Sequence, residues 1–312
     1  MLSDSFQVNY VLVKPHDTEF TPRHEKSRER TDYLGTIYGY REGCLADASK
    51  KGYLGMVKYL ISQGTNVHGG DDDALGWESG GGHLEVVKYL IGVGADVNAS
   101  DALRSASEKG HLEVVEYLAS RGANVHAWGE YALISASENG HLEVVKYLVL
   151  VGADVHAEDD KALKLASGGG HLEIVKYLVS QGANASNDGA LRWASGGGHL
   201  EVVEYLIEGG ANVNAGYGGA LGWASKGGHL EVVEYLVSQG ADVHADDDYA
   251  LRCTSTGNLG VVKYLVGAGA DVHACDDEAL RLASESGHLE VVKYLVLGGA
   301  DVRAHDALIS AS

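Results

Sequence analysis

The stretch His141-Leu142-Glu143-Val144-Val145-Lys146-Tyr147-Leu148, followed by Gly152-Ala153-Asp154-Val155, decides the architecture of this chain. Close copies of it recur between residues 52 and 295. The copies open at Tyr53, His83, His111, His141, His171, His199, His229, Asn258 and His288, in steps of 28 to 30 residues. A period of this length predicts a solenoid of stacked units instead of one globular domain.

One unit, which begins at Asp101, shows why the pattern predicts two helices. Leu112, Val115 and Leu118 recur at spacings of three, which gives the second helix of the unit one buried face. Gly110 ends the first helix, because glycine tolerates a left-handed backbone. Asp101 stands where it would cap that first helix. Helices this short are marginal alone in water, so each unit must bury its apolar face against the next one.

Composition and charge exclude several classes of function. The formal net charge of the 312 residues is −20, and such a surface would repel phosphate backbones, so no nucleic-acid partner is expected. No apolar run has the length of a membrane helix and the amino terminus does not resemble a signal peptide, so we expect an intracellular protein without a membrane partner. Cys44, Cys253 and Cys275 lack paired spacing, which favours reduced thiols.

The repeated pattern resembles the second helix and loop of the ankyrin repeat, from about residue 39 to the end of the chain. This resemblance implies an all-α solenoid of stacked helix-turn-helix units with short finger loops, and binding of proteins without catalysis. Tyr249-Ala250-Leu251-Arg252 and its equivalents replace the family's T-P-L-H, and the unit is shorter than the usual ~33 residues. The shortened form is similar to the ankyrin families expanded in giant DNA viruses of amoebae, which implies action in the host-cell cytoplasm.

The two ends of the chain depart from the period. Residues 1–38 form a non-repeat leader, for which an N-terminal cap and a separate docking segment remain open. Residues 39–312 are expected to form about nine units plus a truncated C-terminal helix, Ala307-Leu308-Ile309-Ser310-Ala311-Ser312. This last helix would leave an apolar face uncovered, which predicts fraying or self-association.

The sequence predicts no catalytic residue, no cofactor and no metal site. Histidines occupy two rows, one at the start of the second helix and one in the finger loops: His68, His126, His156, His244 and His273. Neighbours in a row lie one unit apart, on the order of 10 Å, too far to share one zinc ion, so a structural role is expected. Glycine triplets at 80–82, 168–170 and 196–198 lack the strand and the Lys-Ser/Thr of phosphate loops. No single unit combines a nucleophile, a base and an acid.

Positions that differ between otherwise copied units are the candidates for partner recognition. They are Trp128, Tyr131, Lys161, Tyr217 and Tyr249 in the finger loops, and Arg104, Arg192, Arg252 and Arg281 in the first helices, which are expected to face the concave side. Aromatic residues among carboxylates suit a protein partner with a basic or mixed surface. Helix capping and solubility explain the acidic fingers equally well. Trp77, Trp193 and Trp223 are expected in the core, since large aromatic side chains usually bury.

The sequence therefore predicts a non-enzymatic protein–protein interaction module, an adaptor or sequestering scaffold that binds a partner on its concave face and finger loops. The alternative is a structural component of a viral or cellular assembly.

Overall fold

The computed structural model describes residues 43–69, 73–99, 101–216, 219–254 and 257–303. Throughout this part each unit consists of two short helices and a loop, and the described residues contain no strand. The first helices of the units are residues 43–50, α3 (Asp73–Gly81), α5 (Ala102–Glu108), α7 (Tyr131–Glu138), α9 (Ala157–Gly168), α11 (Asp188–Gly197), α13 (Gly219–Gly227), α15 (Ala245–Thr254) and α17 (Ala274–Glu285). The second helices are α2 (Leu54–Ser62), α4 (Leu84–Gly92), α6 (Leu112–Ser120), α8 (Leu142–Leu150), α10 (Leu172–Ser180), α12 (Leu200–Glu208), α14 (Leu230–Ser238), α16 (Leu259–Gly267) and α18 (Leu289–Leu297).

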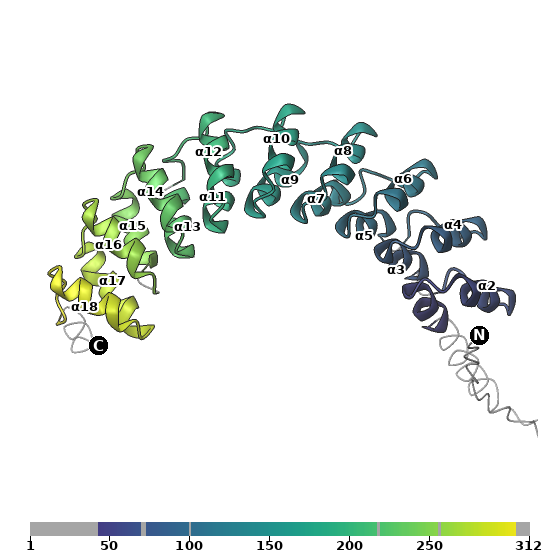
Figure 1. Cartoon of the computed structure of the whole chain (residues 1–312), viewed down its shortest axis with the longest axis horizontal. Helices are drawn as coiled ribbons and strands as arrows, with labels where there is room; N and C mark the ends of the chain where they lie inside the picture. The colour runs from purple at the N-terminus through teal and green to yellow at the C-terminus, as the bar shows by residue number, and fades with distance from the viewer. Residues whose placement is uncertain (1–42, 70–72, 100, 217–218, 255–256, 304–312) are drawn as a thin grey trace, which may run out of the picture.

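The stack of units is bent into an arch (Figure 1). The first helices line its concave edge and are called inner helices below, and the second helices form the convex edge and are called outer helices. Adjacent inner helices contact each other more extensively than adjacent outer helices do, and this difference produces the bend. The expectation that the first helices face the concave side is confirmed.

The buried face of the outer helices is wider than the spacing of three indicated. In α6, Val114, Val115 and Leu118 are at most 1% exposed, whereas Leu112 is only half-buried. Val114 is buried because α6 packs against the preceding unit as well as against its own inner helix. Each outer helix after α2 is thus covered both by the preceding unit and by its own inner helix.

The first helix of the unit ends at a glycine, as expected, but Asp101 does not cap the start of that helix. Gly110 has φ +75°, in the left-handed region that ends the first helix. Asp101 itself has φ +49°, and its side chain makes no hydrogen bond to the helix amides. Its Oδ2 instead accepts a hydrogen bond from Arg104 Nε at 3.4 Å, because the left-handed backbone turns the carboxylate away from the helix amino terminus. In α11 a cap does form, since Asn187 accepts from the backbone N–H of Gly189.

The described helices include none that is both long and apolar enough to cross a membrane. The leader, residues 1–38, and the truncated C-terminal helix, residues 307–312, lie outside the described residues.

Candidate partner-binding surface

The first row of histidines joins consecutive units. His171 Nε2 donates a hydrogen bond to the backbone oxygen of Glu138 at 2.9 Å, and His141 does the same to Glu108 at 2.9 Å. His111, His199 and His229 make the equivalent bond to the preceding inner helix. Asn258 replaces histidine in the eighth unit, and its Nδ2 donates to Gly228 at 2.9 Å. The side chains of this row therefore have a structural role, because they bond each unit to the preceding one.

The second row of histidines holds buried carboxylates. Nδ1 donates to the acidic side chain four residues later in the pairs His126–Glu130, His156–Asp160, His244–Asp248 and His273–Asp277. These carboxylates are 4% to 7% exposed. Among the described residues no group of three or more His, Cys, Asp or Glu lies close enough together to hold a metal ion.

The same carboxylates also join one finger loop to the next. Asp248 Oδ1 accepts from the backbone N–H of Asp271 at 2.9 Å, 23 residues later, and Asp277 does so from Asp301 at 3.2 Å. Asn98 supplies the equivalent bond to Asn124 at 2.8 Å. The last acidic residue of these fingers is therefore structural, whereas Asp159, one residue before the buried Asp160, is 82% exposed.

One group of candidate residues comes together at the fingers on either side of α7. Arg104, Trp128 and Tyr131 line the same shallow hollow between α5 and α7. Lys161 Nζ lies 5.3 Å from the centroid of the Tyr131 ring and also donates to Glu158, which raises the pKa of the Lys161 ammonium group. We call Arg104, Trp128, Tyr131 and Lys161 the finger cluster.

Trp128 is the most exposed residue of the finger cluster, at 75%, and has φ +54°. A left-handed backbone is unfavourable for a large side chain, and such strain is often found at functional sites. The Arg104 guanidinium is held by ion pairs with Asp101 and Glu108 on its own unit.

The remaining candidates are mostly engaged in packing between units. The Tyr249 ring lies on Gly222, where a Cβ atom would be 2.6 Å from ring Cδ1. Arg252 Nη1 donates to Glu278 Oε2 at 2.5 Å, and Arg281 also pairs with Glu278. These two arginines therefore face a carboxylate of this chain. Tyr217 lies outside the described residues.

The expectation that the tryptophans are buried is wrong for Trp193 and Trp223. They are 47% and 44% exposed, and their ring centroids are 6.3 Å apart at an interplanar angle of 30°. Each ring covers a glycine of the preceding inner helix, since a Cβ atom on Gly168 or Gly196 would lie 3.0 Å from it. The inner helices pack so closely that these rings lie over the stack instead of inside it. The side chain of Trp77 lies outside the described ones.

Two cations flank this tryptophan pair. The stem of Arg192 lies over Gly219, where a Cβ atom would be 2.7 Å from Arg192 Cδ, and Lys226 follows Trp223 by three residues on α13. Both side chains are exposed, and neither has an ion-pair partner within the described residues. We call Arg192, Trp193, Trp223 and Lys226 the tryptophan patch. It is basic and aromatic in a chain of net charge −20.

A family model described as ankyrin repeats (3 copies) matches residues 45–127, 122–188, 163–247 and 221–306. The chain belongs to the ankyrin-repeat family. The match confirms an all-α ankyrin-repeat solenoid. Ankyrin repeats generally mediate protein–protein interaction and are typically non-enzymatic. No match was found among the curated proteins with which the chain was compared.

Within this ankyrin-repeat chain, sequence reasoning missed the tryptophan patch although a signal was present. Leu165 is followed three residues later by Gly168, and Trp193 by Gly196. Glu108 and Glu138 occupy the equivalent position in the third and fourth units. In two consecutive units, glycine thus stands where the third and fourth units have a charged side chain, and this leaves room above the inner helices. The large aromatic rings occupy that room.

Proposed function

We propose that this ankyrin-repeat protein is an adaptor or sequestering scaffold that holds a partner protein against its concave face and finger loops. The tryptophan patch is the observation that carries this proposal. Trp and Arg are enriched among the residues that dominate binding energy at protein interfaces. Two indole rings left nearly half exposed side by side are apolar surface that a partner would cover with a gain in free energy.

The finger cluster extends the binding surface and indicates a partner of mixed charge. Asp159 pairs with Lys164 of its own unit, but its side chain is still 82% exposed and can accept basic side chains of the partner. Arg192 and Lys226 suit acidic side chains at the tryptophan patch. A partner that engages both regions would present apolar anchors with basic groups toward the fingers and acidic groups toward the patch.

The alternative function is that of a structural component of a viral or cellular assembly. The exposed apolar face of the first unit, where Met56 is 48% and Tyr59 is 55% exposed, favours this alternative if another molecule covers it. Self-association through the C-terminal end belongs to the same alternative. The giant-virus origin and action in the host-cell cytoplasm also remain proposals, which the short unit supports.

Affinity capture with the full chain tests the proposed function. We expect a substoichiometric partner that is retained by the wild type, and lost from Trp193→Ala/Trp223→Ala and from Trp128→Ala/Tyr131→Ala. Leu150→Ala is the matched control, because Leu150 is 80% exposed at the end of α8, on the outer helices. Capture that survives both double variants would refute the binding surface, and a protein that is abundant in purified particles would favour the structural alternative.

A further inference from the structure

The first unit exposes a face that every later unit buries. Met56 on α2 is 48% exposed. The equivalent residue of the other outer helices is at most 2% exposed: Val86, Val114, Val144, Ile174, Val202, Val232, Val261 and Val291. In those units the preceding unit covers the position. The described residues contain no preceding unit for Met56.

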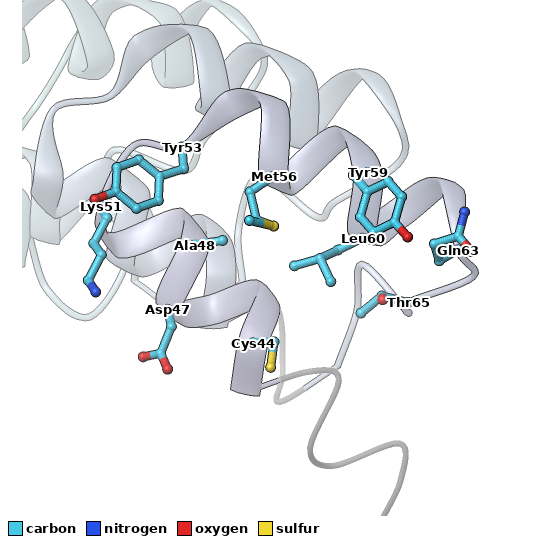
Figure 2. A pocket seen from close by; sticks show the side chains of 10 residues that line it. All are labelled: Cys44, Asp47, Ala48, Lys51, Tyr53, Met56, Tyr59, Leu60, Gln63 and Thr65. Atoms are coloured by element: carbon cyan, nitrogen blue, oxygen red, sulfur yellow. The ribbon is translucent and has the colours of Figure 1, made fainter. Parts of the chain in front are cut away.

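This face is hollowed into a cavity of about 610 Å³ between the helix at residues 43–50 and α2 (Figure 2). Met56 and Leu60 form its apolar wall, and Tyr53 and Tyr59 stand on opposite sides of it (Figure 2). Thr65 also lines the cavity, is 6% exposed, and its hydroxyl has no hydrogen-bond partner in the described part of the chain. The cavity thus combines uncovered apolar side chains with a buried polar atom that lacks a partner.

We propose that the chain's own residues Tyr33–Tyr40 occupy this cavity and cap the solenoid. The segment Tyr33-Leu34-Gly35-Thr36-Ile37-Tyr38-Gly39-Tyr40 is uncharged and supplies aliphatic and aromatic side chains. The described structure begins at residue 43, and Cys44 lines the cavity.

The distance along the chain favours this segment over the other apolar run of the leader. From Tyr40 to residue 43 the chain spans at most about 10 Å, so the segment can reach the cavity without a long connection. The run Phe6-Gln7-Val8-Asn9-Tyr10-Val11-Leu12-Val13 is separated from residue 43 by almost thirty residues, and closing that longer loop costs more entropy. A second copy of the chain would have to bring its opposite end to this face, which gives an open, concentration-dependent assembly.

Alkylation of Cys44 in the full chain tests the cap. Peptide mapping by mass spectrometry follows Cys44, with the exposed Cys275 as internal reference. We expect native Cys44 to react roughly tenfold more slowly than in urea, because a covered site reacts only through local opening. Leu34→Asp/Ile37→Asp should abolish this protection, and Val11→Asp/Val13→Asp is the matched control that should leave it unchanged.

Three results would overturn the cap. Absence of protection in the wild type would show an open face, and loss of protection in Val11→Asp/Val13→Asp alone would assign the cavity to the other run. Protection that rises with protein concentration, together with a larger sedimentation coefficient, would assign it to a second copy. None of these readouts depends on partner binding, so the cap and the proposed function can fail separately.

Discussion

The imidazole of His171 packs directly against Gly140 of the preceding unit. A Cβ atom on Gly140 would lie 2.7 Å from His171 Cε1, and the φ of Gly140 is +81°. His171 Nε2 donates at the same time to the Glu138 backbone oxygen at 2.9 Å. The histidine and the glycine that recur in the sequence are therefore one contact that spans two units.

Substitutions at this contact should be strongly coupled. Gly140→Ala should lower the free energy of unfolding by about 2–3 kcal/mol, since it adds both a clash and backbone strain. His171→Ala should lower it by about 1–2 kcal/mol through loss of the hydrogen bond and packing. The double variant should lose less than the sum, because removal of the imidazole leaves room for the new methyl group. Urea unfolding followed by circular dichroism measures all three.

Gly152 provides the control for this coupling. Its φ is +107°, but a Cβ atom there would meet nothing within 4 Å. Gly152→Ala should therefore carry only the backbone strain, and its effect should add to that of His171→Ala. Additive effects of the Gly140 and His171 substitutions would contradict the contact.

The Arg252–Glu278 ion pair should make the junction between α15 and α17 sensitive to acid. The hydrogen bond from Arg252 lowers the pKa of Glu278 below its usual 4.5. The stabilisation is complete above pH 4.5 and is lost as the pH falls through the lowered pKa. Glu278→Gln should cost about 1 kcal/mol at pH 7, and this difference should shrink toward zero in acid. Urea unfolding at pH values between 7 and 3 tests whether the effect of Glu278→Gln decreases in acid.

Glu290→Gln is the comparison for that experiment, because the side chain of Glu290 is 68% exposed in its pair with Lys293. Exposed pairs of this kind contribute little to stability. A pH-independent effect of Glu278→Gln, or an equal effect of Glu290→Gln, would show that the Arg252–Glu278 pair does not set the acid sensitivity.

Three consecutive left-handed residues should make one finger position prefer glycine. Asp246, Asp247 and Asp248 have φ between +51° and +56°, and Asp247 is exposed. Asp247→Val should destabilise by about 1–2 kcal/mol, because a β-branched side chain is disfavoured there, whereas Asp247→Gly should be nearly neutral.

At Glu234, exposed on α14, the order of stability should reverse. Glu234→Gly should be less stable than Glu234→Val, since glycine is the poorer residue in a helix. Thermal unfolding compares the four variants. A higher stability of Asp247→Val than of Asp247→Gly would contradict the left-handed backbone conformation of Asp247.

Cys253 and Cys275 should differ in reactivity. Burial raises the pKa of the Cys253 thiol, which reduces the thiolate that reacts with iodoacetamide. Cys275 is exposed at the tip of a finger. We expect Cys275 to be alkylated roughly tenfold faster near neutral pH, with the difference abolished in urea. Equal native rates would contradict the packing of α15.

The fold could be read from the sequence because each unit repeats one local pattern. The spacing of Leu112, Val115 and Leu118 predicted the outer helix, and Gly110 predicted where the inner helix ends. Asp101 was placed wrongly as a cap because its left-handed backbone depends on how the loop returns to the stack. For the candidate site, sequence variation pointed to Trp128, but it could not show that Arg104 and Tyr131 line one hollow with it, or that Lys161 lies over the Tyr131 ring.

The sequence by itself determined the solenoid and its period, because these depend on spacing along one chain and repeat with it. Only the tertiary structure decided which variable side chains are available to a partner. Arg252 turns to Glu278 of the next unit and Arg281 to Glu278 and Glu285 of its own helix, whereas Trp193 and Trp223 stay exposed over glycines of the preceding inner helices. The physical reason is that burial in a stack is set by what the adjacent unit presents, about thirty residues away, and not by the residue's own helix.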